Sequence, residues 1–136
     1  MTDGKSTKEA VSLKIYESAE DYLEKILMLT ERNGEVRSID IATEMGVTKP
    51  SVSIAMKNLR EKEQITVTDA GYIYLTDAGR EIAEMIYERH EMISQGLMAL
   101  GVPKEIALED ACRIEHVISK ESFDAVKKLI QSKLQL

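Results

Sequence analysis

Three side chains able to ligate a metal lie within five consecutive positions of the carboxyl-terminal half of the chain. In "DACRIEHVIS", residues 110–119, these are the thiol of Cys112, the carboxylate of Glu115 and the imidazole of His116. Their i, i+3, i+4 spacing is that of one face of an α-helix, and the surrounding run is predicted to be helical. Taken singly, a lone helical cysteine is usually a small core residue, and adjacent Glu and His are usually surface groups. The set therefore needs further donors before it indicates a metal site.

Three further donors lie on other predicted helices. His90, the only other histidine, lies on the long helix before this stretch and would approach it if the two helices pack antiparallel. Asp21 and Glu24 form an i, i+3 pair on the first predicted helix. Together these oxygen, nitrogen and sulfur donors suit a five- or six-coordinate first-row transition metal better than Ca²⁺ or Mg²⁺. A structural zinc site would more often use several cysteines with CxxC spacing, and this chain has one cysteine.

Length and composition limit the class of protein that has to position these donors. The 136 residues are enough for one compact domain or two small subdomains. Aromatic residues make up only 4% and there is no tryptophan, which favours helices over a β-sandwich or barrel. No apolar stretch approaches the roughly 20 residues needed to span a bilayer, and the first residues lack the apolar core of a secretion signal. We therefore expect a cytoplasmic protein without membrane contact, in which Cys112 is a free thiol.

The hydrophobic periodicity predicts a mainly α-helical fold with a single β-hairpin. Glycine, proline and capping residues set the expected element boundaries. In chain order the elements are a helix from near Ser18 to Asn33, short helices at 38–45 and 48–62 separated by Gly46, a hairpin pairing 65–68 with 72–75, a long helix from Thr76 to about Gly101, a helix opening at Pro103, and a last helix over 120–134. The order predicts a flexible N-terminus (1–14), a winged helix-turn-helix DNA-binding domain (15–75) and a second, helical domain (76–136).

The second short helix carries a local excess of positive charge. Between Val47 and Lys62 the sequence has four cationic residues and a single acidic residue, Glu61, in a chain whose net charge is −6. In a helix-turn-helix, the amino-terminal residues of the second helix meet base edges in the major groove, and lysines contact phosphates. The residues that we expect to contact DNA are Ser38, Thr48, Lys49, Pro50, Ser51, Ser53, Lys57 and Arg60.

The acidic remainder of the chain should suppress nonspecific DNA binding. Affinity should then depend on a homodimer that places two such helices about 34 Å apart on a palindromic double-stranded operator. The alternative is a small helical subdomain whose basic face is merely solvated.

From about Ser18 onward the chain resembles the diphtheria toxin repressor family of metal-dependent transcription regulators, which includes the manganese-transport regulators. The matching segments are "AEDYLEKILML", "GVTKPSVSIAMKNL", "LTDAGREIAEMIYERHEMI" and "EDACRIEHVIS". The resemblance implies a DNA-binding domain followed by a helical metal-binding and dimerisation domain (76–136), with metal ligands at their junction. It also implies repression of metal-uptake genes when metal is plentiful. The chain is similar to a short form that lacks the SH3-like domain of longer members.

The resemblance makes the predicted ligand set a hybrid of the iron and manganese branches of the family. It implies that Asp21 and Glu24 match manganese-branch positions, whereas Cys112 matches the iron branch. His90, Glu115 and His116 match both branches. A second site of the iron branch would need a histidine and a glutamate where this chain has Leu108 and Ser94. We expect Fe²⁺ or Mn²⁺, and binding of Co²⁺, Ni²⁺ or Zn²⁺ in vitro. Thiolate prefers Fe²⁺ to Mn²⁺, and cellular availability leaves Fe²⁺ slightly ahead.

Three other interpretations compete with this one, and the simplest is a helical dimerisation module whose polar stripe is merely solvated. A winged-helix regulator could respond to an organic ligand or to oxidation of Cys112. The adjacent Arg113 would favour a reactive thiolate there, whereas Asp110 and Glu115 oppose it. An enzyme is not expected, because the sequence has no phosphate-cradling glycine loop, no nucleophile elbow and no spare base near the donors.

Overall fold

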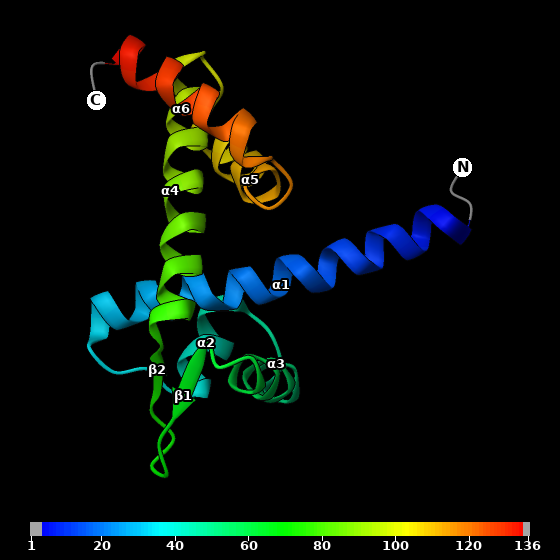
Figure 1. The fold of residues 1–136 in the computed structure, drawn as a ribbon, viewed down its shortest axis with the longest axis vertical. Helices are drawn as coiled ribbons and strands as arrows, with labels where there is room; N and C mark the ends of the chain where they lie inside the picture. The colour runs from blue at the N-terminus through cyan, green and yellow to red at the C-terminus, as the bar shows by residue number, and fades with distance from the viewer. Residues whose placement is uncertain (1–3, 135–136) are drawn as a thin grey trace. The chain divides into compact units, whose positions relative to one another are not determined.

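The computed structural model describes the backbone of residues 4–134 and the side chains from Ala19 to Leu134. Six helices and one two-stranded sheet make up this part of the chain (Figure 1). They are α1 (Gly4–Asn33), α2 (Ser38–Met45), α3 (Lys49–Glu61), β1 (Ile65–Val67), β2 (Ile73–Leu75), α4 (Asp77–Ala99), α5 (Lys104–Ile114) and α6 (Lys120–Leu134). The chain divides into two compact units, the first ending at Glu84 and the second beginning at Met85. None of the described helices is long and apolar enough to cross a membrane.

Helix α1 is longer than the sequence predicts. It begins at Gly4 rather than near Ser18, so the segment expected to be loose is already helical from Gly4 onward. No glycine or proline interrupts residues 5–33, and Ser18 can cap a helix only where the chain enters one. The part of the expected flexible segment before Gly4 lies outside the described residues. The helix ends as predicted, because Gly34 adopts a φ of 84° and its N–H bonds to the Thr30 carbonyl at 2.8 Å.

Helices α2 and α3 form the predicted helix-turn-helix. Gly46 takes a left-handed φ of 66° and its N–H bonds to the carbonyl of Ala42, which ends α2. The Thr48 side chain caps α3 by accepting from the N–H of Ser51 at 3.3 Å. Pro50 stands in the first turn, where its missing N–H costs no helical hydrogen bond. The buried face of α3 consists of Val52, Met56 and Leu59.

Strands β1 and β2 pair antiparallel as the predicted wing, with Ile65 opposite Leu75. They are one residue shorter at the turn than expected, although Thr68 N–H still bonds to Tyr72 O at 2.9 Å. The core of the first unit joins α1, α2, α3 and both strands, and it also includes Ala83 from α4. The compact unit therefore continues past Leu75, the expected end of the DNA-binding domain, into the first turns of α4.

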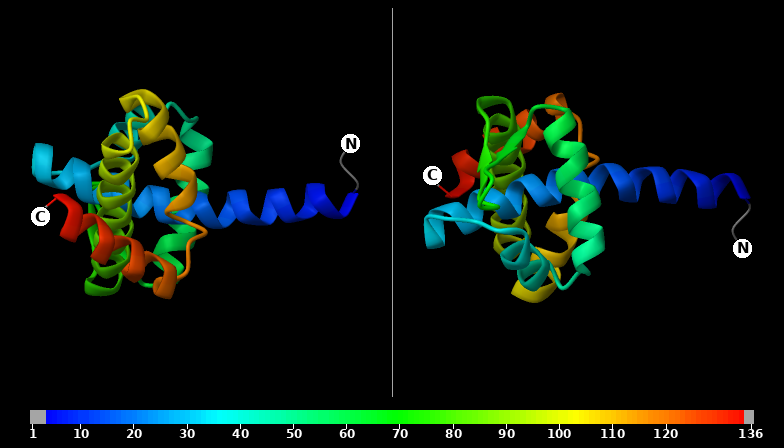
Figure 2. Two further views of the ribbon diagram at one scale, coloured as in Figure 1. Left: turned by 90° about the horizontal axis from the view of Figure 1, so that it is seen from above. Right: turned by 90° about the horizontal axis from the view of Figure 1, so that it is seen from below.

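The second unit consists of the carboxyl-terminal part of α4 together with α5 and α6 (Figure 2). Ile93, Ala111 and Phe123, one from each helix, are buried together at its centre. The chain leaves α4 through Gly101, which has a φ of 101°. This packing sets one face of α4 against the last turn of α5, and that face carries His90.

Candidate metal centre and recognition helix

The donors of the "DACRIEHVIS" stretch lie across the end of α5. The helix ends at Ile114, so Cys112 is in its last turn while Glu115 and His116 are in the turn that follows. The prediction of one continuous helical face is therefore wrong at its end. Val117 and Ile118 both direct their N–H groups to the Ile114 carbonyl at 3.0 Å, which tightens the chain before α6. Glu115 keeps helical dihedral angles, φ −58° and ψ −25°, and so remains beside Cys112.

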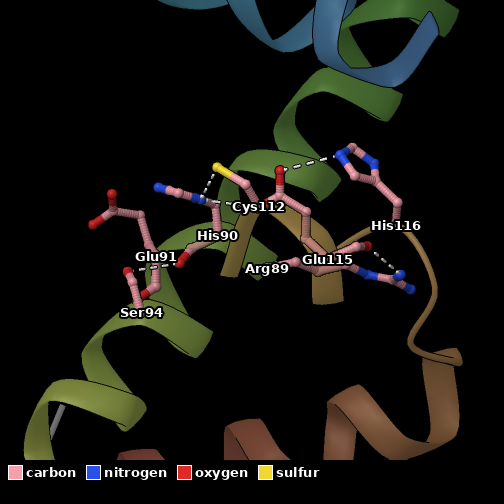
Figure 3. Close-up of polar contacts among 7 residues, drawn as sticks. All are labelled: Arg89, His90, Glu91, Ser94, Cys112, Glu115 and His116. Carbon is pink, nitrogen blue, oxygen red and sulfur yellow. Dashed lines mark hydrogen bonds and ion pairs between the residues drawn. The ribbon is translucent and has the colours of Figure 1, made fainter. Parts of the chain in front are cut away.

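The structure brings His90, Cys112 and Glu115 together from α4 and the end of α5 (Figure 3). Glu115 Oε2 lies 2.9 Å from His90 Nδ1, and Cys112 Sγ lies 3.8 Å from the same nitrogen. One donor atom from each residue lies within 4.8 Å of the other two. The antiparallel approach of the two helices, expected from the sequence, thus assembles a nitrogen, a sulfur and an oxygen donor.

Glu115 is the most deeply placed member of this cluster. Its side chain is fully buried, and Oε1 has no hydrogen-bond partner within the described part of the chain. His116 Nε2 lies 3.4 Å from Oε1, close enough for an ion pair but without hydrogen-bond geometry. A buried carboxylate oxygen without a hydrogen bond is costly unless a cation compensates it. The mixed donor set and this oxygen both fit a first-row transition metal ion.

The neighbours of His90 favour its charged form. The Cys112 sulfur and the Glu115 carboxylate hydrogen-bond to the ring and raise the pKa of His90 to about 10, although partial burial lowers it. His90 is therefore protonated on both ring nitrogens at neutral pH when no metal is bound. A metal can bind this imidazole only by displacing one of the two protons.

Metal binding should consequently release protons and strengthen as the pH rises. With a folded-state pKa near 10, His90 contributes one proton throughout pH 6–8, so the association constant should rise roughly tenfold per pH unit from this group alone. Calorimetric titration of Mn²⁺ in buffers of different ionisation enthalpy counts the released protons. Titration without proton release at pH 7 would show that His90 is not a ligand.

Arg89, which the sequence pattern does not single out, contacts the turn that carries Glu115 and His116. Its Nη1 donates to the carbonyl of Glu115 at 3.1 Å and to that of Ile118 at 2.8 Å. The guanidinium also lies 5.5 Å from the ring centre of Phe123 in α6. Arg89 thereby ties α4 to the turn that holds two candidate ligands (Figure 3). These hydrogen bonds join residues 26 and 29 positions apart in the sequence, so local spacing does not predict them.

Replacing Arg89 by alanine should weaken metal binding without removing a donor. Outer-shell partners of metal ligands typically contribute about 10- to 100-fold to affinity, and we expect a loss in that range. Arg113→Ala is the matched control, because Arg113 is an exposed α5 residue paired with Glu109 at 3.0 Å. Mn²⁺ affinity can be measured by competition with a fluorescent chelator. Equal affinities of the two variants would refute a positioning role for Arg89.

Asp21 and Glu24 lie one turn apart on α1, in the first unit. Glu24 is buried and Asp21 is half-buried. Their participation with the donors of the second unit stays a prediction. Ser94 stands where the resemblance places a glutamate of the iron branch's second site. Its buried hydroxyl donates to the His90 carbonyl of the same helix at 2.7 Å.

All the residues predicted to contact DNA have exposed side chains. Ser38 is the first residue of α2, and the others lie at the cap or on the outer faces of α3. They are Thr48, Lys49, Pro50, Ser51, Ser53, Lys57 and Arg60. The helix-turn-helix therefore leaves these side chains accessible to a groove and its phosphates.

Comparisons with known proteins agree with both parts of this arrangement. Residues 14–70 match the family model "Iron dependent repressor, N-terminal DNA binding domain", and residues 76–133 match "Iron dependent repressor, metal binding and dimerisation domain". The chain is 36% identical over 115 residues to the transcriptional regulator MntR of Escherichia coli O6:H1, covering 85% of this chain and 74% of that protein. It is 35% identical over 114 residues to the HTH-type transcriptional regulator MntR of Bacillus subtilis, covering 84% and 80%.

Solved structures show the same architecture. The manganese regulator SloR superposes with a TM-score of 0.75 at 29% identity, and the metal-dependent transcriptional regulator MtsR with a TM-score of 0.77 at 26% identity. Each comparison covers 83% of this chain and 53% of the solved chain. The chain thus spans about half the length of these solved proteins.

Proposed function

Because the chain belongs to the iron-dependent repressor family of transcriptional regulators, we propose that it is a metal-dependent repressor that binds operator DNA as a homodimer. The observation that carries this proposal is the cluster of His90, Cys112 and Glu115, in which a buried carboxylate oxygen has no hydrogen bond to any of the described residues. The exposed face of α3 supplies the DNA-binding surface. The family consists of regulators rather than enzymes, and we place this one in the cytoplasm.

We assign the metal to donors from both units. Asp21 and Glu24 would supply carboxylates from α1, and the second unit would supply the donors of His90, Cys112, Glu115 and His116. The bound ion would be Fe²⁺ or Mn²⁺, and it would provide the positive charge that compensates these carboxylates. The sulfur of Cys112 favours the softer metals, while the two α1 carboxylates accept manganese.

In this proposal the ligands themselves couple metal binding to DNA binding. Asp21 and Glu24 belong to the helix that packs against α2 and α3, so holding them beside donors of the dimerisation unit would restrict the orientation of α3. Without that restraint, few conformations of the dimer place two copies of α3 correctly on a palindromic operator. Metal then selects the competent conformations. A complete switch from 1:99 to 99:1 needs about 5.5 kcal/mol of differential binding, which is within reach of a metal linked to structure.

The test is a DNA-binding titration with and without metal. A duplex selected from a random library in the presence of Mn²⁺ serves as the operator, and fluorescence anisotropy reports binding. We expect Mn²⁺ or Fe²⁺ to strengthen binding about 5- to 150-fold over chelator, the usual range of coupling between two sites. Equal affinity with metal and with chelator would rule out the proposed switch.

A redox regulator is the second candidate, and one contact favours it. Cys112 is exposed and its sulfur lies 3.8 Å from His90 Nδ1, which leaves the thiol accessible to an oxidant. If this candidate is correct, peroxide will change operator binding in metal-free buffer and the Cys112→Ser variant will not respond. A response to metal that survives in Cys112→Ser would favour the metal switch instead.

A further inference from the structure

A large apolar side chain lies in the middle of the exposed face of α3. Ile54 is 64% exposed, whereas Val52, Met56 and Leu59 form the buried stripe of the same helix. At 3.6 residues per turn, Ile54 is rotated by about 200° from Val52 and so points away from the core. A single exposed isoleucine on an ordinary surface needs no explanation. This one, however, lies in the second turn of the helix that carries the predicted DNA contacts.

The hydroxyl groups at the start of α3 are already engaged with one another. Thr48 Oγ1 lies 2.8 Å from Ser51 Oγ and also accepts from the Ser51 N–H at 3.3 Å. Both side chains therefore hydrogen-bond within the helix cap, which leaves them fewer donors and acceptors for hydrogen bonds to base edges. Pro50 is exposed one turn before Ile54, and Lys57 is exposed one turn after it. The outer ridge of α3 consequently presents an apolar pair followed by a cation.

We propose that Ile54 determines operator specificity by packing on the C5-methyl group of a thymine in each half-site. This inference rests on the proposed function. Of the four natural bases, only thymine carries a methyl group in the major groove, and apolar side chains recognise it by contact. Lys57, one turn further along the same ridge, would meet a phosphate, which positions the helix without reading sequence.

The experiment is a uracil scan of the selected operator. Each thymine of the Mn²⁺-selected duplex is replaced in turn by deoxyuridine, which removes the methyl group and keeps the base pair. For the unchanged protein we expect one thymine per half-site at which the substitution weakens binding about fourfold, the value of one buried methyl group, and about 15-fold when both half-sites are changed. For Ile54→Ala, the uracil and thymine duplexes should bind equally at that position.

Two comparisons separate the possible outcomes. Lys57→Ala should weaken binding to every duplex, reduce its dependence on salt and retain the sensitivity to uracil. If Ile54→Ala keeps the same sensitivity as the unchanged protein, or if no thymine is sensitive, the assignment of Ile54 is wrong although the repressor function stands. If the metal-loaded protein selects no DNA sequence at all, the proposed function fails together with this inference.

Discussion

Replacing Glu115 by glutamine is expected to abolish metal-dependent DNA binding. Glu115 is fully buried, one of its oxygens lies 2.9 Å from His90, and the other has no hydrogen bond within the described residues. Glutamine has nearly the same shape but carries no charge, so it cannot compensate a divalent cation in a buried site. Since outer-shell partners already contribute about 10- to 100-fold, loss of a buried charged ligand should weaken Mn²⁺ binding by more than about 100-fold.

The matched control for this prediction is Glu109→Gln. Glu109 lies on α5 but is exposed and pairs with Arg113 across the helix surface, so its charge should matter little. Metal affinity is measured by chelator competition, and operator binding by anisotropy at saturating Mn²⁺. Circular dichroism and the dimer mass establish that both variants fold and associate. A Glu115→Gln variant that is folded and still binds the operator only with metal would contradict the assignment of Glu115 as a ligand.

Replacing Cys112 by glutamate is expected to change which metal activates the protein. The thiolate is the only soft donor in the proposed set, and a carboxylate in its place leaves only oxygen and imidazole donors. We expect Co²⁺ and Zn²⁺ to bind at least about tenfold more weakly, while Mn²⁺ affinity stays the same or increases. The sulfur-to-cobalt charge-transfer absorption of the Co²⁺-loaded protein should disappear in the variant.

The Cys112→Ser variant separates loss of sulfur from gain of a carboxylate. It should lose the charge-transfer band as well, but without an increase in Mn²⁺ affinity. Affinities for Mn²⁺ and Co²⁺ are compared as a ratio within each protein, which cancels any general weakening of the site. An unchanged ratio in Cys112→Glu would show that ligand softness does not set the metal preference.

Much of the fold could be predicted because its signals are local. Gly46, the Thr48 cap and the buried stripe of α3 each depend on neighbours within one or two turns, and the structure has all three. The meeting of His90 with Cys112 could also be predicted, because short connections between helical segments favour antiparallel neighbours. The chain has only two histidines, so few alternative sets of donors existed.

Other features depend on contacts that no local pattern encodes. The end of α5 at Ile114 places His116 beyond the helix, and it is fixed by the tightened turn before α6 rather than by a glycine or proline. Arg89 holds that same turn from α4, and an arginine on an amphipathic helix gives no sign of such a role. The polar composition of the first residues predicts a loop, whereas α1 begins at Gly4, because every residue from Lys5 to Asn33 can be helical.

Anomalous X-ray diffraction at the manganese edge, from crystals of the Mn²⁺-loaded protein, tests the central claim most directly. We predict an anomalous peak at the cluster of His90, Cys112 and Glu115, with a carboxylate of Asp21 or Glu24 bonded to the same ion at about 2.0–2.3 Å. A peak bonded only to donors of the second unit, or a peak away from this cluster, would contradict the account. In that case metal binding would not connect the dimerisation unit to the recognition helix.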